Sequence, residues 1–544
     1  MPVASKRLPL ELSNDPYHQI LFSIIQKHTR NSPHRLAAIS AENPNEKVTF
    51  LELRDAILSV ASFLKSRGFK KDDVVALATL NTWHYLAFFM GAAVNGGAGS
   101  GMAPISTPLE MQRQISECGA SAVLTTEAVL PKVLEAVEKC PKVKTIVVVG
   151  DCQKDSNDEI VSWDDVIRTK HLDFDDVEID AKQDVIHLPF SSGTTGTPKG
   201  VMITHQNLST MMDIYTRSDR LNVSILEPPF DFERENYLLY LPFYHVYGLL
   251  LALDALHLGV CSVMMSHFNS TVFCQSIEKY KMRTVNVVPP ILLLMVKSPL
   301  AAKFDLSSVE LIVSGAAPLG KGLCEEVIRK LPKAKIQQGW GMSELTTACS
   351  IPDFREEQPF GCVGSIINNT KVMIVDLETG NECPISVSGE ICIQGPTVMK
   401  GYLNNPEATK ETIRNGWLYT GDIGYLDNDC HLFVVDRLKE LIKVKGFQVP
   451  PAELESLLLT HPKIKDAAVV GIKHENLGEV PKAYIVAQAN ASLTEDEVHL
   501  FVNDKVSKYK QLLGGIEFID EIPKAPSGKI LRRLLRKKHN NNTL

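Results

Sequence analysis

Short apolar runs rich in β-branched residues alternate with longer helical patterns through most of the chain. The clearest runs are Val74–Leu80, Thr145–Val149 and Thr284–Val288, and the clearest helical patterns are Pro108–Glu117 and Pro131–Lys139. Apolar runs separated by helices are typical of strands that are buried between helical layers. The alternation therefore predicts an α/β fold in which helices cover a parallel sheet.

The pattern changes near Gly361, where short strands and turns replace the helices. The strand-like segments of this region are Lys371–Asp376, Gly389–Gln394 and His431–Asp436. We expect residues 361–435 to form a β-barrel or small sheet. This part would close a large N-terminal domain that spans residues 1–435.

A smaller α+β pattern ends the chain. One helix is expected at Pro450 and another from the Thr494–Glu497 capping box, because proline at a helix start and a capping box both mark N-termini. A chain of 544 residues is also too long for one typical core. We therefore expect a separate small C-terminal domain at residues 441–544.

The overall charge gives no signal for a polyanionic partner. Lys plus Arg total 57 against 64 Asp plus Glu, which leaves a formal net charge of -7. This balance provides no general attraction for nucleic acid or for an anionic membrane. No nucleic-acid partner is expected, and any site for an anion must be local.

The eleven cysteines are scattered, without a CxxC pair or a regular spacing. This distribution argues against a disulfide framework or a zinc ribbon and favours a reducing compartment. The N-terminus carries no apolar run of the signal-peptide kind, and the final Asn-Thr-Leu is not the Ser-Lys-Leu type of peroxisomal address. A cytoplasmic protein is expected, with a peroxisomal location left open.

One stretch, Tyr237–Met265, is mostly apolar over a length that could span a bilayer. It contains Asp254, His245 and His257, together with Pro242. Ionisable residues and proline inside the stretch disfavour a lipid-facing helix. We expect a buried strand and helix here, and no transmembrane segment.

The segment Ser191–Gly200, SSGTTGTPKG, is rich in glycine and in hydroxyl side chains and follows the predicted strand Val185–Phe190. Backbone N–H groups and hydroxyls of such a loop can surround an anion. The spacing is not that of a Walker A loop, because Lys199 is followed by glycine and not by Ser or Thr. Taken alone, the segment fits a phosphate site and a surface turn equally well.

Six further motifs follow this loop in order: Leu241–Gly248, Ser314–Pro318, Gln338–Glu344, Tyr419–Gly424, Asp436–Lys443 and Pro523–Lys529. In order and spacing they closely resemble the acyl-adenylate-forming superfamily of acyl-CoA synthetases, 4-coumarate-CoA ligases and beetle luciferases. The resemblance runs from roughly residue 40 to residue 535. It implies that a carboxylate attacks the α-phosphate of ATP, that pyrophosphate leaves, and that the thiol of coenzyme A then takes the acyl group.

The resemblance also implies how the nucleotide is bound. Thr194 and Thr195 would donate hydroxyls to the β- and γ-phosphates, Asp422 would bind the ribose, and Glu344 would bind magnesium, a cation that prefers oxygen ligands. The expected ATP- and AMP-binding residues are Ser191, Ser192, Gly193, Thr194, Thr195, Gly196, Lys199, Gln338, Gly339, Trp340, Gly341, Ser343, Asp422 and Arg437.

Two of these positions depart from the family pattern. Trp340 stands where relatives usually carry Tyr, and Ser343 where they usually carry Thr. An indole can still stack on adenine, so nucleotide binding remains the expectation. Without the motif around it, Trp340 would be interpreted as a core residue, Asp422 as a turn aspartate and Glu344 as a helix-capping acid.

The resemblance implies a division of labour between two lysines. Lys529 is expected beside the α-phosphate in adenylation, where an ammonium stabilises the charge of the transition state; the alternative is that it merely belongs to the basic run Lys529–Lys538. The resemblance also implies a hinge at residues 436–440 that makes the small domain mobile. Lys443 is expected at the site during thioester formation, after rotation about Lys439, and His245 is expected at the carboxylate of the acid. The expected CoA-binding residues are Lys445, Gly446 and Gln448, and the expected acyl-binding residues are Tyr247, Ala316 and Thr347.

The expected substrate is a plain carboxylic acid, either fatty or 4-coumarate-like. The motif around His245 contains no Asp of the kind that amino-acid-activating relatives use to pair an α-amino group. ATP, Mg2+ and coenzyme A are the expected cofactor and co-substrates. A luciferase-like oxygenase, a loader of carrier proteins and a non-catalytic nucleotide- or acyl-binding protein stay open as alternatives.

Overall fold

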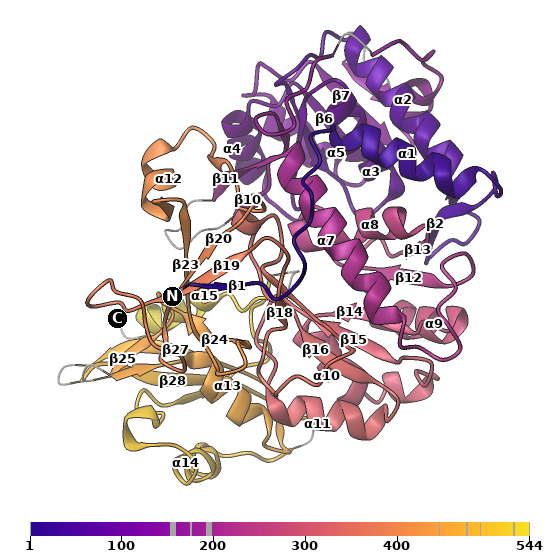
Figure 1. Ribbon diagram of the computed structural model, residues 1–544. Coiled ribbons are helices and arrows are strands. Elements are labelled where there is room, and N and C mark those ends of the chain that lie inside the picture. The colour runs from indigo at the N-terminus through magenta and orange to yellow at the C-terminus, as the bar shows by residue number, and fades with distance from the viewer. Residues whose placement is uncertain are drawn as a thin grey trace.

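The computed structural model describes residues 2–152, 159–174, 177–191, 198–444, 447–474, 477–489, 491–525 and 528–542, with the backbone alone for residues 448 and 540–542. Figure 1 shows a large N-terminal part, which begins in indigo, and a small C-terminal unit beside it that ends in yellow. The arrangement is a mixed α/β fold with a separate C-terminal unit, which confirms the predicted class.

The largest sheet has nine strands in the described residues, ordered β10-β11-β9-β5-β4-β6-β7-β8, with β21 paired to β11. These strands are β4 (Val74–Ala78), β5 (Ala98–Gly101), β6 (Ala122–Thr126), β7 (Thr145–Val149), β8 (Ile160–Ser162), β9 (Val185–His187), β10 (Phe190–Ser191), β11 (Lys199–Thr204) and β21 (Gly401–Tyr402). The strands from β9 to β8 pair in parallel, whereas β10, β11 and β21 pair antiparallel. The predicted parallel sheet is therefore confirmed.

Two smaller sheets continue the large part, ordered β12-β13-β2-β3 and β14-β15-β16. Their strands are β2 (Leu36–Ser40), β3 (Lys47–Thr49), β12 (Asn236–Leu239), β13 (Cys261–Met264), β14 (Thr284–Val287), β15 (Leu311–Ser314) and β16 (Lys335–Gln338). The carboxyl ends of the parallel strands β14, β15 and β16 meet at Val287, Ser314 and Gln338. Ligands of open α/β sheets commonly bind at this edge, and the loops that follow carry several of the expected site residues.

Helices of the large part pack on these sheets (Figure 1). They are α1 (Tyr17–Thr29), α2 (Phe50–Ser66), α3 (Trp83–Val94), α4 (Pro108–Cys118), α5 (Leu130–Val137), α6 (Trp163–Ile167), α7 (His205–Val223), α8 (Val246–Leu258), α9 (Ser270–Tyr280), α10 (Pro289–Lys297), α11 (Lys321–Lys330) and α12 (Pro406–Thr412). Capping boxes begin α2, α4 and α7, where Thr49, Thr107 and Thr204 each accept the N–H three residues on.

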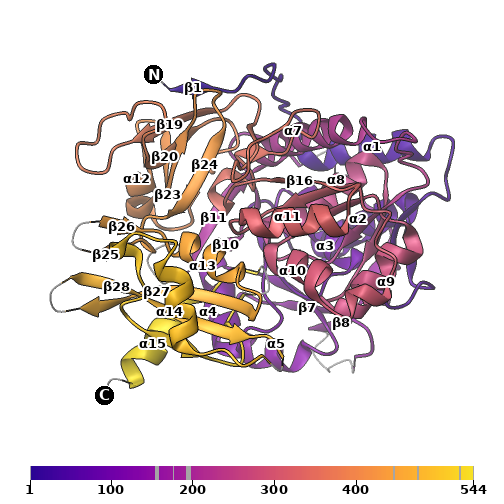
Figure 2. The same ribbon diagram turned by 90° about the horizontal axis from the view of Figure 1, so that it is seen from below.

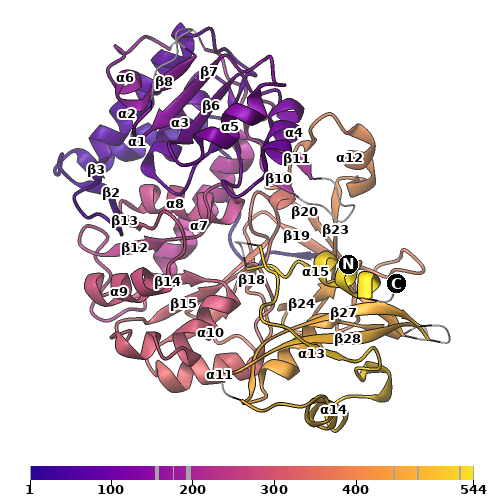
Figure 3. The same ribbon diagram turned by 180° about the vertical axis from the view of Figure 1, so that it is seen from behind.

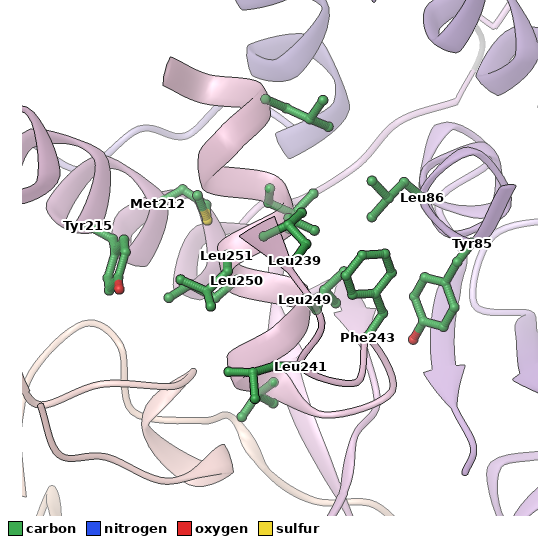
Figure 4. Packing of buried hydrophobic residues seen from close by; sticks show 14 of the residues in the cluster. Tyr85, Leu86, Met212, Tyr215, Leu239, Leu241, Phe243, Leu249, Leu250 and Leu251 are labelled. Carbon is green, nitrogen blue, oxygen red and sulfur yellow. The ribbon is translucent and has the colours of Figure 1, made fainter. Parts of the chain in front are cut away.

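The apolar stretch Tyr237–Met265 forms β12, α8 and β13, as predicted. All residues of α8 except Tyr247 are buried. Figure 4 shows leucines of α8 packed among side chains that include Tyr85 and Leu86 of α3 and Met212 of α7. Within the described residues, none of the helices combines the length and the apolar character that crossing a bilayer requires.

The strands after Gly361 form an antiparallel sheet, ordered β1-β19-β20-β23-β22 with β24 paired to β23. Its strands are β1 (Val3–Ala4), β19 (Lys371–Val375), β20 (Gly389–Gln394), β22 (Ile413–Arg414), β23 (Trp417–Leu426) and β24 (Leu432–Arg437), and the short pair β17 (Ser350–Ile351) and β18 (Ser365–Ile366) lies outside it. In the described part of the chain these pairings do not close into a ring, so the expected barrel is an open sheet.

The small unit has its own sheet, ordered β26-β25-β28-β27 with β29 paired to β28. Its elements are β25 (Ile442–Val444), β26 (Phe447–Val449), α13 (Pro451–Leu459), β27 (Ile464–His474), β28 (Gly478–Ala487), α14 (Glu495–Asn503), β29 (Ile516–Phe518) and α15 (Arg532–Asn542). Leu454, Leu458, Val469 and Ile485 belong to a core that is separate from that of the large part. The hydroxyl of Thr494 accepts the N–H of Glu497, as the predicted helix start requires.

The small unit lies against α10 and α11, as Figures 2 and 3 show. Lys297 Nζ of α10 donates to Leu459 O of α13 at 3.4 Å. A cleft of about 1600 Å³ remains between the two parts, and Tyr244 and Val288 line one wall while Phe518 lines the other. The exact boundaries at residues 435 and 441 stay a prediction.

Candidate active site

Asp422, Trp340 and Arg437 form one polar cluster. Asp422 of β23 is the cross-strand partner of Arg437 of β24. Trp340 Nε1 donates to Asp422 Oδ2 at 2.9 Å, and Arg437 Nε lies 3.1 Å from Oδ1. Oδ1 is buried yet accepts no well-formed hydrogen bond from the described residues. Since buried polar atoms are normally satisfied, this oxygen is suited to accept a ligand hydroxyl.

Glu344 forms a second cluster with the strand pair that flanks the SSGTTGTPKG loop. The carboxylate is buried, and its Oε1 accepts hydrogen bonds from Ser191 Oγ at 3.0 Å and from the Tyr402 hydroxyl at 2.8 Å. Lys199, opposite Ser191 in the β10–β11 pair, has its Nζ 4.9 Å from the centre of the Tyr402 ring. One end of the loop therefore contacts the carboxylate of Glu344 directly, and the other lies over the ring of Tyr402, whose hydroxyl contacts the same carboxylate.

The segment Gln338–Gly341 follows the end of β16. Gln338 Oε1 accepts the N–H of Leu319 at 2.9 Å, and Gly339 N donates to Ser314 O at 3.0 Å. A Cβ on Gly341 would lie 1.8 Å from Thr347 O, so only glycine fits here. Ser343 begins the single turn Ser343–Leu345 that carries Glu344. The structure thus joins these residues to the two clusters.

Lys529 lies half-buried beside the Asp422 cluster. Its pKa is lowered to about 8, first by burial and then by the positive charge of Arg437, while Asp422 and Glu440 oppose the shift. The pKa of His245 is lowered to about 4, first by burial and then by the charge of Lys529. Lys529 therefore lies within range of the charges of the Asp422 cluster, and His245 lies within range of the charge of Lys529.

His245 caps the start of α8. Its Nδ1 accepts the N–H of Tyr247 at 3.3 Å. A neutral imidazole that accepts at Nδ1 carries its proton on Nε2. His245 can therefore donate one hydrogen bond from Nε2 near neutral pH.

A small cavity lies behind His245. It is lined by Leu241, Pro242, His245, Tyr247, Gly248, Val288 and Ala316. The Tyr247 hydroxyl donates to Asn286 Oδ1 at 3.3 Å, and Thr347 Oγ1 donates to Val246 O at 3.3 Å. Ala316 has φ 68 and Thr347 has φ 123, backbone conformations that residues other than glycine rarely adopt. The three expected acyl residues thus lie near one another, two of them with unusual backbone.

The structure does not bring Lys443 to this site. Lys443 is exposed on β25, where its N–H donates to Glu479 Oε2 at 3.0 Å. Lys439 is also exposed. Several expected residues lie outside those described: Ser192, Gly193, Thr194, Thr195, Gly196, Lys445, Gly446 and the side chain of Gln448.

Sequence reasoning missed three residues of the site. Tyr402 reaches Glu344 because β21 pairs with β11, and no motif marks it. Asn286 is a polar residue inside an apolar strand, a signal that could have been noticed. Glu440 was expected only as part of the hinge, yet it acts on the charge of Lys529.

Comparison with known families agrees with this geometry. Residues 25–403 match the family described as AMP-binding enzyme, and residues 453–529 match the AMP-binding enzyme C-terminal domain. The chain belongs to the AMP-binding enzyme family, and the resemblance to acyl-adenylate-forming enzymes is confirmed.

Individual relatives extend over nearly the whole chain. The 4-coumarate:CoA ligase 1 of Petunia hybrida is 39% identical over 528 residues, which cover 96% of this chain and 94% of that protein. The 4-coumarate–CoA ligase 2 of Nicotiana tabacum is 40% identical over 530 residues, which cover 96% and 95%. This chain is therefore similar to 4-coumarate-CoA ligases from end to end.

Solved structures with the same fold include two CoA ligases. The anthranilate CoA ligase AuaEII in complex with anthranoyl-AMP has a TM-score of 0.85 at 24% identity, covering 98% of this chain and 99% of that one. The o-succinylbenzoate CoA synthetase of Bacillus subtilis with its acyl-adenylate intermediate has a TM-score of 0.77 at 26% identity, covering 94% and 97%. These likenesses confirm the fold.

Proposed function

We propose that this protein is an ATP-dependent, AMP-forming acid–CoA ligase. It activates a plain carboxylic acid as an acyl-adenylate and then transfers the acyl group to coenzyme A. The observation that carries the proposal is the meeting of Lys529 with Asp422, Arg437 and His245, which come from three distant segments. This set offers a ribose acceptor, cations for a phosphate and a donor for a carboxylate.

In the nucleotide site, Asp422 binds the ribose, because its buried Oδ1 accepts no well-formed hydrogen bond from the described residues while Trp340 donates to Oδ2. The Trp340 ring packs on adenine. Ser191, Lys199 and the loop between them bind the β- and γ-phosphates. Arg437 adds a planar guanidinium that suits phosphate and ribose oxygens.

Glu344 fits a magnesium ion bound together with phosphates. Its carboxylate is buried, and the hydroxyls of Ser191 and Tyr402 both donate to Oε1 and orient it. Magnesium commonly binds one or two carboxylates plus phosphate oxygens. When bound, the ion would neutralise charge on the β- and γ-phosphates.

In the first step, a carboxylate oxygen of the acid forms a bond to the α-phosphorus, and the bond to the bridging oxygen of pyrophosphate breaks. Lys529 stabilises the negative charge that develops on the α-phosphate. A lysine at about 4 Å in an effective dielectric of about 20 contributes on the order of 4 kcal/mol. His245 Nε2 donates to the carboxylate and orients it.

In the second step, the sulfur of coenzyme A forms a bond to the acyl carbon and AMP leaves. Lys443 is exposed in this arrangement, so we propose that the small unit rotates about Lys439 and exchanges Lys529 for Lys443. Lys445, Gly446 and Gln448 would then bind coenzyme A. ATP and coenzyme A are both available in the cytoplasm, which we propose as the location.

The acid is proposed to be 4-coumarate-like, because relatives that are 39% and 40% identical over 96% of this chain are 4-coumarate–CoA ligases. Gly248 and Ala316 line the small cavity behind His245. The Tyr247–Asn286 hydrogen bond places polar atoms near the cavity, where a ring hydroxyl could bind. 4-Coumarate has this combination of a ring, a hydroxyl and a plain carboxylate.

ATP–pyrophosphate exchange over a panel of cinnamic, fatty and short-chain acids tests the proposal. We expect the fastest exchange with 4-coumarate-like acids, and thioester and AMP once coenzyme A is added. Asp422→Ala should abolish exchange, whereas Asp429→Ala, an exposed acid in the β23–β24 turn, should not. Exchange with palmitate alone would reverse the substrate assignment. If no acid supports exchange, the protein is a non-catalytic nucleotide- or acyl-binding protein. Light emission with luciferin and ATP would indicate a luciferase-like oxygenase.

A further inference from the structure

The turn between β24 and β25 is tied to the small unit at both of its ends. On the β24 side, Asp436 Oδ2 accepts the N–H of Ala452, the second residue of α13, at 3.1 Å. On the β25 side, Glu440 Oε2 accepts a hydrogen bond from Arg536 Nη2 at 2.6 Å. Two carboxylates thus connect this turn to the first and the last helix of the small unit.

The last helix, α15, is anchored one turn earlier by Arg532. Its Nη2 donates to both carboxylate oxygens of the buried Glu455 at 2.8 Å. Arg532 and Arg536 are four residues apart and therefore lie on one face of the helix. Lys529 precedes Arg532 by only three residues, so its position depends on how α15 is held.

Glu440 also lies within range of the charge of Lys529. The charged groups around Lys529 are Asp422 of β23, Arg437 of β24, Glu440 of the turn and Arg532 of α15, with His245 at the start of α8. The two carboxylates favour the protonated ammonium, and the two guanidinium groups disfavour it. Glu440 is thus the acid that both contacts α15 and acts on the charge of Lys529.

We infer that Glu440 is a positioning residue for adenylate formation, because its ion pair with Arg536 holds α15, and with it Lys529, against the nucleotide site. The inference rests on the proposed function, in which Lys529 serves the first half-reaction. Thioester formation from a supplied acyl-adenylate does not need the pair, because Lys443 is the lysine expected there.

Variants of the full-length protein that reverse one charge of the pair, or swap both charges, test the role of the Glu440–Arg536 ion pair. Arg536→Glu and Glu440→Arg each place like charges face to face, so ATP–pyrophosphate exchange at pH 6.5 should fall about fivefold. Conversion of supplied acyl-adenylate to thioester should stay within about twofold. The double variant restores an ion pair, so its exchange at pH 6.5 should return to within about twofold of the wild type.

The pH profile separates position from charge. In the double variant an arginine faces Lys529, which lowers the pKa of the ammonium further, so exchange should decline at a lower pH than in the wild type. The matched control is Glu453→Gln. Glu453 lies in the first turn of α13 and pairs with Lys510 at 2.6 Å, both within the small unit, and its loss should leave the profile unchanged.

Amide hydrogen exchange of residues 436–440 and 528–536 gives a readout that needs no substrate. It should be faster in both single variants and return to the wild-type rate in the double variant. Wild-type rates in the single variants, no recovery in the double variant, or equal loss of both half-reactions would overturn the inference. A wild type that exchanges pyrophosphate with no acid contradicts the proposed function instead, and hydrogen exchange then still decides whether the pair holds α15.

Discussion

Trp340 holds one oxygen of Asp422 through its indole N–H, at 2.9 Å. Trp340→Phe keeps an aromatic face for adenine and removes this donor. We expect the KM for ATP to rise about fivefold, the equivalent of a hydrogen bond of about 1 kcal/mol, with little change in the rate of exchange at saturation. Trp417→Phe, in the same strand as Asp422, should leave KM unchanged. An unchanged KM in Trp340→Phe would remove Trp340 from the nucleotide site.

Lys529 makes adenylation sensitive to alkaline pH. Its pKa is lowered to about 8 by burial and by Arg437, and the protonated ammonium is the form that stabilises phosphate charge. As pH rises above 8 the proton is lost, so the exchange rate should fall about tenfold per pH unit. Lys529→Arg stays charged, and its remaining activity should not show this decline. A wild-type profile that is flat up to pH 9.5 would contradict the assignment.

At the scale of elements, local sequence patterns predicted the helices and strands that contiguous residues form. The stretch Tyr237–Met265 became two strands around α8 because its apolar residues and helix signals are contiguous. The motif residues Trp340, Asp422 and Arg437 also meet as expected. The open sheet in place of a barrel depends on long-range pairing, including that of β1 from the N-terminus with β19, which no local pattern specifies.

Strand pairing also explains the role of Tyr402. It lies opposite Val201 of β11, which brings its hydroxyl to Glu344. Tyr402→Phe removes that donor but keeps the ring beneath Lys199. We expect the Mg2+ concentration for half-maximal exchange to rise about threefold or more, because Glu344 loses one of the two hydroxyls that orient it.

The matched control for this change is Tyr419→Phe. Its ring lies 4.4 Å from the guanidinium of Arg414, and among the described residues its hydroxyl is not one of the donors to Glu344. Equal Mg2+ dependence in the wild type, Tyr402→Phe and Tyr419→Phe would show that Glu344 does not bind the ion.

At the scale of the whole molecule, the small unit presents one of its two candidate lysines to the large part. Lys529 lies beside Asp422 and His245, whereas Lys443 is exposed on β25. A rigid protein with this arrangement could use only Lys529. Rotation of the small unit would bring Lys443 to the same site. The two half-reactions should therefore depend on different lysines.

Separate measurement of the two half-reactions in Lys529→Ala and Lys443→Ala tests this account most directly. Lys529→Ala should lower ATP–pyrophosphate exchange about a thousandfold, as loss of about 4 kcal/mol of charge stabilisation implies, while supplied acyl-adenylate is still converted to thioester. Lys443→Ala should show the reverse. Equal loss of both half-reactions in both variants would contradict the division of labour on which the account depends.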